Sequence, residues 1–103
     1  MLFYLTICTN VHTIEMNYSW DPEKARKNFQ KHGVRFPDLE SIFEDERAIV
    51  IDEDIPGEDR SVIIGMDGLA RILVVVYAKR GDDLRIISAR KADSKERKQY
   101  GER

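Results

Sequence analysis

Residues 60–90 read RSVIIGMDGLARILVVVYAKRGDDLRIISAR and contain three apolar, β-branched runs separated by short turn sequences. β-branched residues are enriched in strands, and Asp67-Gly68 and Gly81 are typical of the tight turns that join antiparallel strands. A fourth run precedes these three, so the predicted strands are 48–52, 60–66, 71–79 and 84–90. The unbroken apolar stretch Ile72–Val76 indicates a central strand that is covered on both faces.

A helix is predicted before this sheet, over Pro22–His32. Asp21 is a typical N-cap, and a proline at the first helical position loses no hydrogen bond because that N–H has no partner within the helix. Gly33 suits the left-handed conformation that ends helices. The spacing of the apolar side chains predicts one face made by Ala25, Phe29 and His32.

Two further helices complete the predicted fold. Phe36–Phe43 carries large apolar residues on one side, which indicates a short amphipathic helix. Asp93-x-x-Glu96 has the spacing of a capping box and opens a last helix whose one large apolar residue is Tyr100, so we expect this helix to be loose or held by something else. The pattern predicts an α+β domain with two N-terminal helices, a four-stranded antiparallel sheet and a C-terminal helix. Tyr18–Trp20 is an additional short strand candidate.

The length and composition favour one intracellular domain. A chain of 103 residues has enough interior for a single core. Residues 1–15 contain no lysine or arginine, and we expect them to be an N-terminal extension, either a frayed or partner-bound tail or the product of a start upstream of Met16, with the domain at 16–103. The alternative is an added β-strand, because Leu2–Ile7 is rich in residues that favour strands. The single cysteine, Cys8, excludes an internal disulfide and fits the cytoplasm. No apolar run approaches the 18 residues of a membrane span, so no membrane is expected as a partner.

The charges are unevenly distributed along the chain. The formal net charge is −2, which excludes a wholly electrostatic nucleic-acid binder of the histone kind. Residues 38–59 hold ten acidic residues and one basic residue, whereas residues 84–103 hold seven basic and three acidic residues. Each run can be a solvated face, but a domain polarised in this way can also steer partners.

Known cofactor and metal motifs are absent from the sequence. His12 and His32 are the only histidines, and neither a paired-cysteine motif nor a glycine-rich phosphate loop occurs. We therefore expect neither a cofactor nor a metal. What remains for chemistry is a group of basic and polar residues on the late strands and helix, namely Arg60, Tyr77, Lys79, Arg80, Arg85, Ser88, Arg90 and Lys91.

Strict alternation along the last strand predicts that Arg85 and Arg90 emerge on opposite faces of the sheet. A guanidinium group offers forked and permanently charged donors that suit phosphate. The alternative for each arginine is an ion pair with the acidic segment 38–59. His32 lies at the end of an apolar helix face, where a buried hydrogen-bonded histidine and a proton shuttle are both consistent with the sequence.

Several segments resemble the BrnT family of bacterial toxins. They include WDPEKARKNFQKHGVRF at Trp20–Phe36 and RIISARKA at Arg85–Ala92, followed by Glu96 and Tyr100. The likeness covers about residues 18–100 in the right order. It implies a type II toxin with a RelE-like ribonuclease fold that cleaves RNA without a metal, inhibits translation, and forms a hetero-oligomer with a co-encoded, DNA-binding, BrnA-like antitoxin.

The resemblance also implies roles for the residues that remain for chemistry. Arg60, Arg85 and Arg90 would clamp phosphate, His32 or Tyr77 would transfer protons, and Lys79 and Lys91 would bind RNA. Two other functions stay open at this point. One is a non-catalytic interaction module that binds a DNA-binding antitoxin. The other is a plain nucleic-acid-binding domain, which an isoelectric point near 5.7 disfavours.

Overall fold

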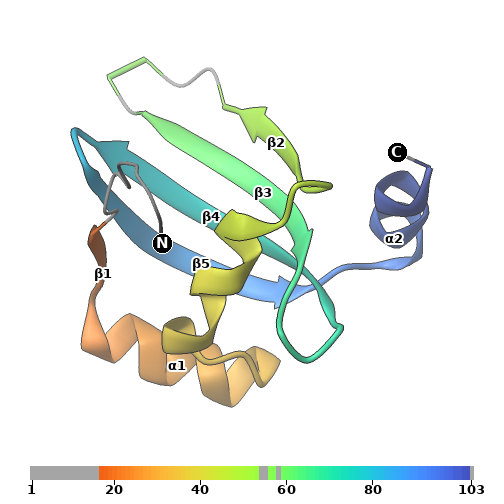
Figure 1. Cartoon of the computed structure of the whole chain (residues 1–103). Helices are drawn as coiled ribbons and strands as arrows, with labels where there is room; N and C mark the ends of the chain where they lie inside the picture. The colour runs from red at the N-terminus through yellow and green to blue at the C-terminus, as the bar shows by residue number, and fades with distance from the viewer. Residues whose placement is uncertain (1–16, 54–55, 58, 103) are drawn as a thin grey trace, which may run out of the picture.

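The computed structural model describes residues 17–53, 56–57 and 59–102, which form a five-stranded sheet with helices on both sides (Figure 1). The elements in chain order are β1 (Asn17–Trp20), α1 (Pro22–His32), the 3₁₀ helix η1 (Phe36–Glu44), β2 (Ile49–Asp52), β3 (Arg60–Met66), β4 (Ile72–Arg80), β5 (Asp83–Lys91) and α2 (Ser94–Gly101). The strand order is β1-β5-β4-β3-β2.

The sheet is mixed, which corrects the prediction of four antiparallel strands. β2 to β5 form the expected antiparallel meander, with ends within one residue of those predicted. β1 adds a fifth strand that runs parallel to β5. The short strand candidate Tyr18–Trp20 therefore belongs to the sheet, and α1 follows the first strand rather than opening the fold. A parallel pair needs a long crossover, which the intervening elements provide.

The second predicted helix is a 3₁₀ helix rather than an α-helix. Its buried residues Phe36, Leu39 and Ile42 recur every three positions. Three residues per turn is the period of a 3₁₀ helix, so this spacing places all three side chains on one line that faces the sheet. These residues pack with Leu73 and Val75 of β4 in the main core.

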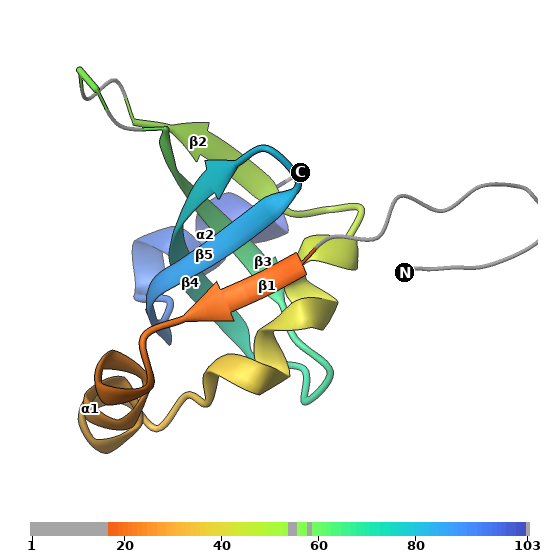
Figure 2. The ribbon, with the colours of Figure 1, turned by 90° about the vertical axis from the view of Figure 1, so that its left-hand side faces the viewer.

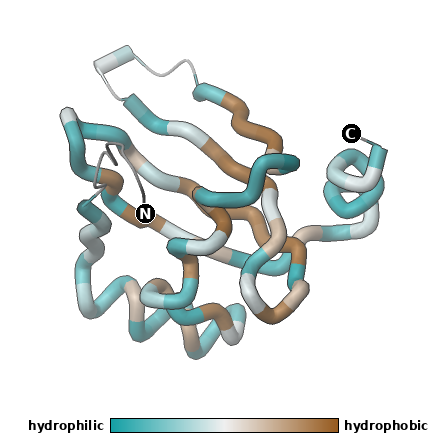
Figure 3. Tube along the Cα trace, in the orientation of Figure 1, coloured by the Kyte–Doolittle hydropathy of each residue, from teal (hydrophilic) through white to brown (hydrophobic). Residues whose placement is uncertain are grey.

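Opposite faces of the sheet carry η1 and α2 (Figure 2). The main core lies between the sheet and η1, whereas α2 reaches the other face through a smaller cluster of Ile64, Val74, Ala92 and Tyr100. Hydrophobic residues concentrate in the strands, while α2 is predominantly hydrophilic (Figure 3). The second face of the sheet is consequently covered only in part.

The first helix has the predicted bounds but buries a different residue. Asp21 accepts a hydrogen bond from the Glu23 N–H, and Gly33 adopts φ +72°, so both ends follow the sequence signals. Phe29 is 49% exposed, and Asn28 is the buried residue of the helix. The Asn28 amide donates to the Ala89 carbonyl at 2.8 Å and accepts from the Ala89 N–H at 3.1 Å. It thereby completes the edge of β5 beyond the end of β1.

A β-bulge interrupts the alternation of β5. Val76 faces Ser88 and Tyr77 faces Ile86, so Ile87 is an extra residue without a partner in the register. Leu84, Ile86 and Ala89 are all buried in the main core. Their odd spacing is possible because a bulge inserts one residue into a strand. The same shift places the side chains of Arg85 and Arg90 on one face, which corrects the prediction of opposite faces.

The last helix is held by polar contacts rather than by a broad apolar face. The capping box is present, because Asp93 accepts from the Glu96 N–H and Glu96 accepts from the Asp93 N–H. Tyr100 is buried, and its hydroxyl donates to Asp45 Oδ2 at 2.7 Å.

Across the described residues, the helices are too short or too polar to cross a membrane.

Candidate functional site

Arg60 and Arg85 stand on either side of Ala78 in one row across three strands. Arg60 pairs with Ala78 between β3 and β4, and Ala78 pairs with Arg85 between β4 and β5. Directly opposed residues of antiparallel strands project to the same side of a sheet. Two cationic side chains therefore flank a small one on the face that carries α2, about 10 Å apart at their Cα atoms, which is two strand spacings.

The neighbouring rows form the floor of a groove of about 400 Å³. Val62 pairs with Val76, and Val76 pairs with Ser88, in the row next to the two arginines. The next row contains Arg90. The groove is lined by Ile51, Glu53, Val62, Ile64, Val74, Val76, Ser88, Arg90, Glu96 and Gln99. It exists because α2 covers only one end of this face, and it combines an apolar floor with charged walls.

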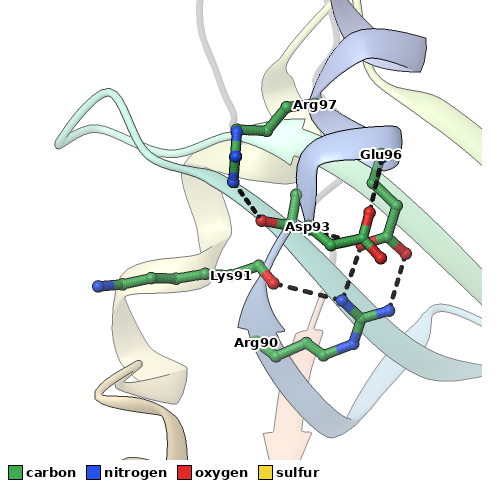
Figure 4. A network of polar contacts seen from close by, with 6 residues as sticks. Arg90, Lys91, Asp93, Glu96 and Arg97 are labelled. Atoms are coloured by element: carbon green, nitrogen blue, oxygen red, sulfur yellow. Dashed lines mark hydrogen bonds and ion pairs between the residues drawn. The ribbon is translucent and has the colours of Figure 1, made fainter.

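A network at the start of α2 holds Arg90 in place (Figure 4). Arg90 Nη1 donates to Glu96 Oε1 and Nη2 donates to Glu96 Oε2, each at 2.8 Å. Nη1 also donates to the Lys91 carbonyl at 3.3 Å. The hydrogen bond from Arg90 lowers the pKa of Glu96 from 4.5 to about 2. This ion pair is not sealed off, because the Arg90 side chain remains 43% exposed.

Arg60 lies beside a carboxylate of the same groove. Its Nε is 3.9 Å from Glu53 Oε1, and the hairpin between β2 and β3 joins the two backbones through a hydrogen bond from the Glu53 N–H to the Arg60 carbonyl. Glu53 belongs to the acidic segment 38–59, so the alternative of pairing with that segment applies in part to Arg60. The carboxylate that pairs with Arg90 belongs to Glu96 of α2, outside that segment. The Arg85 side chain is exposed.

Tyr77 lies on the other side of the sheet, in the main core. It is 8% exposed, and its ring meets Phe43 edge-on with centroids 5.0 Å apart. Burial, followed by the charges of Asp52 and Asp59, raises the pKa of Tyr77, against a hydrogen bond with Ser61. His32 is half-buried in the last turn of α1 and does not line the groove. The structure thus separates both predicted proton-transfer residues from the three arginines.

The two predicted RNA-binding lysines also lie on the other face. Lys79 pairs with Leu84 and Lys91 pairs with Leu73, and both of these leucines belong to the main core. Both lysines are exposed. Figure 4 shows the Lys91 side chain extending away from the Arg90 guanidinium.

Sequence reasoning missed the two glutamates that line the groove. Glu96 was visible as the third residue of a capping box, but that pattern carries no sign of an ion pair with Arg90. Glu53 was one of ten acidic residues in a charged segment, and only the hairpin places it beside Arg60. Within the part of the chain that the structure describes, His, Cys, Asp and Glu form no cluster suited to a metal ion.

Comparisons with known proteins assign the family. The model of the family described as "Ribonuclease toxin, BrnT, of type II toxin-antitoxin system" matches residues 20–96, which include the whole antiparallel meander and Glu96. A crystal structure of the Brucella abortus ribonuclease toxin BrnT matches with a TM-score of 0.66 and 33% identity, over 78% of this chain and 100% of that chain. No curated protein gives a significant match. The chain belongs to the BrnT family of ribonuclease toxins, whose members act in type II toxin–antitoxin systems.

Proposed function

We propose that this protein is a metal-independent endoribonuclease whose active site is the groove on the α2 face of the sheet. The observation that carries the proposal is the row of Arg60, Ala78 and Arg85, with Arg90 further along the same face. Guanidinium groups bind phosphate oxygens through paired donors. Here three of them emerge on one face: Arg90 lines the groove, and Arg60 and Arg85 stand in the row next to its floor. The description of the family as ribonuclease toxins supports RNA as the substrate class.

The proposed reaction uses the 2′-hydroxyl of the RNA as the nucleophile. The 2′-oxygen forms a bond to the adjacent phosphorus, and the bond from phosphorus to the 5′-oxygen breaks. The leaving 5′-oxygen takes up a proton from solvent, so the products are a 2′,3′-cyclic phosphate and a 5′-hydroxyl, and no water molecule is consumed in this step. Negative charge builds on the phosphoryl oxygens in the transition state, and preorganised cations such as Arg85 and Arg90 stabilise it there.

A carboxylate in the groove is the proposed proton acceptor for the 2′-hydroxyl. Of the described residues that line the groove, Glu53 and Glu96 carry carboxylates. The pKa of Glu96 is held near 2 by Arg90, which makes it a weak base. Glu53 lies beside Arg60 without such a bidentate partner in the described part of the chain, so we assign it the role of the base. The proposed reaction does not use His32 or Tyr77, which lie outside the groove.

The test is cleavage of RNA by purified protein in the presence of EDTA. We expect cleavage to persist, the products to end in 2′,3′-cyclic phosphate, and RNA with 2′-deoxy nucleotides to resist. Replacing Arg60, Arg85 or Arg90 with alanine should lower the rate while the protein stays folded. Unchanged cleavage in all three folded variants would remove the proposed site, and loss of cleavage in EDTA would remove the metal-independent mechanism.

An antitoxin partner follows from membership of a type II system. We further propose that this partner is a BrnA-like, DNA-binding protein, that the two form a hetero-oligomer in the cytoplasm, and that RNA cleavage by the free toxin stops translation. Expression of this chain alone should arrest growth, and co-expression of the neighbouring small reading frame should restore growth. Arrest that persists in a variant without RNA cleavage would favour a non-catalytic interaction module.

A further inference from the structure

We propose that Glu96 is a positioning residue, whose carboxylate fixes one edge of the Arg90 guanidinium so that its other edge can bind a phosphate of the RNA. This inference rests on the proposed function, because it assigns Arg90 to phosphate binding in the same groove. It adds a residue of α2, an element that the proposed reaction does not otherwise use.

The hydrogen bonds of Arg90 divide its donors into two sets. The end of the guanidinium, formed by Nη1 and Nη2, is taken by the two oxygens of Glu96, and the second hydrogen of Nη1 points to the Lys91 carbonyl. The side edge, formed by Nε–H and the second hydrogen of Nη2, makes no hydrogen bond to a residue in the described ranges. A guanidinium carries five donors in a fixed plane, so holding one edge orients the other.

The surroundings of Arg90 fit a second ligand rather than a closed ion pair. Its side chain is 43% exposed, and both Arg90 and Glu96 line the groove together with Ser88 and Gln99. A buried structural ion pair would instead shield both partners from solvent. The ion pair of Arg90 and Glu96 carries no net charge. The two N–H groups on the side edge of Arg90 are still oriented as a pair of donors, which is the arrangement that binds a phosphate.

The position of Glu96 is itself fixed by the fold of α2. Its Oε1 accepts from the Asp93 N–H at 2.9 Å as part of the capping box, and the same atom accepts from Arg90 Nη1. Tyr100 anchors the other end of α2 to Asp45. The helix, which contributes little to the core, thereby holds the Glu96 carboxylate against the guanidinium (Figure 4).

The two roles of Glu96 can be separated by Glu96→Gln. Glutamine can still accept from the Asp93 N–H, because capping boxes use either residue, but it cannot form the bidentate ion pair. Glu102→Gln removes one negative charge from the C-terminal end of the same helix and is the matched control. Asp93→Ala removes the N-cap, together with one negative charge near Arg90, while leaving Glu96 in place, and it reports on the attachment of the helix. Thermal melting confirms that each variant is folded.

The first measurement is RNA cleavage at saturating and limiting substrate. We expect Glu96→Gln to lower kcat about 10²-fold, the loss typical of a misplaced catalytic group, and Glu102→Gln to cleave as the wild type does. Asp93→Ala should lose clearly less than Glu96→Gln. The inference is overturned if Arg90→Ala abolishes cleavage while Glu96→Gln does not lower it, and also if Asp93→Ala and Glu96→Gln lose activity equally.

The second measurement does not depend on catalysis. The ¹H–¹⁵N signal of Arg90 Nε is followed by NMR during addition of inorganic phosphate to the full chain. We expect the signal to shift with phosphate in the wild type and in Glu102→Gln, and the shift to be lost in Glu96→Gln. No shift in the wild type, or equal shifts in all three proteins, overturns the inference. If Arg90→Ala leaves cleavage intact, the assignment of Arg90 in the proposed function fails, and this measurement still decides the role of Glu96.

Discussion

Replacing Glu96 with glutamine should make the free energy of unfolding of this protein depend less on pH in the acidic range. In the wild type, the Arg90 hydrogen bonds hold the pKa of Glu96 at about 2 instead of 4.5. A carboxyl whose pKa is lower in the folded state stabilises the fold above its unfolded pKa, and that contribution is lost as the pH falls toward the folded pKa. Glutamine does not titrate, so the variant lacks this contribution at every pH.

The size of the effect can be estimated from that pKa. A fall from 4.5 to about 2 corresponds to at most about 3 kcal/mol of unfolding free energy at neutral pH. The Arg90 side chain is 43% exposed, and solvent screening reduces the worth of such pairs. We therefore expect the variant to be about 1–2 kcal/mol less stable than the wild type at pH 7. The difference should be about halved, or smaller still, at pH 3.

Urea unfolding of the wild type, Glu96→Gln and Glu102→Gln at pH 7, 5 and 3 measures this dependence. The difference between the wild type and Glu96→Gln should be constant from pH 7 to 5 and should shrink between pH 5 and 3. Glu102→Gln should show little difference at any of these values. A destabilisation by Glu96→Gln that stays the same down to pH 3 would show that the lost contribution is packing or capping, not the ion pair.

Three other substitutions probe the groove, the anchor of α2 and the edge of β5. Ala78→Glu should place a carboxylate between Arg60 and Arg85, and because that charge opposes the binding of phosphate, it should lower the rate of RNA cleavage about 10²-fold relative to Ala78→Gln. Equal rates in the two folded variants would argue against the site. Tyr100→Phe should lower the free energy of unfolding by about 1.5–3 kcal/mol in chemical denaturation at pH 7, because the Tyr100 hydroxyl donates to a charged Asp45. The pKa of Asp45 is lowered in the folded state, so this penalty should shrink as the pH falls below the usual pKa of an aspartate. A penalty that does not change with pH would contradict the assignment. Asn28→Ala should lower the free energy of unfolding by about 2 kcal/mol or more and speed hydrogen exchange at the Ala89 amide, because the N–H and the carbonyl of the buried Ala89 both lose their partner. Unchanged protection of the Ala89 amide would show that water replaces the side chain.

Much of the fold could be predicted from local signals in the sequence. The turn sequences and β-branched runs gave the antiparallel meander nearly residue for residue, and Asp21 and Gly33 gave both ends of α1. These signals succeed because a cap or a tight turn depends on a few adjacent residues. The parallel pairing of β1 with β5 depends instead on residues more than sixty positions apart, and a four-residue strand carries no mark of its partner.

The buried face of α1 shows a second limit of pattern reading. Hydropathy favours Phe29 over Asn28 as the buried residue, yet Asn28 is buried because its amide matches the two free groups of Ala89. A buried polar side chain is tolerated when its hydrogen bonds are complete, and that condition is set by the strand it meets. The periodicity of the sequence does not identify such a partner, which lies 61 residues away in the chain.

The candidate site was the least predictable part, because it depends on a shift in one strand. The three arginines were identified from their chemistry, but regular alternation put Arg85 and Arg90 on opposite faces. The main core requires Leu84, Ile86 and Ala89 on the same side, and this requirement is met only with the extra residue at Ile87.

The bulge that satisfies the core therefore also determines the surface chemistry. If Ile87 were paired in the register and β5 alternated regularly, the strand could bury either Ala89 or the pair Leu84 and Ile86, but not all three. In either arrangement, one of the two arginines of β5 would turn toward the η1 side, where its charge would meet the apolar core. The core and the cluster of arginines thus depend on the same irregularity. Bulges commonly occur beside active sites because they redirect a side chain without moving the strand out of its sheet.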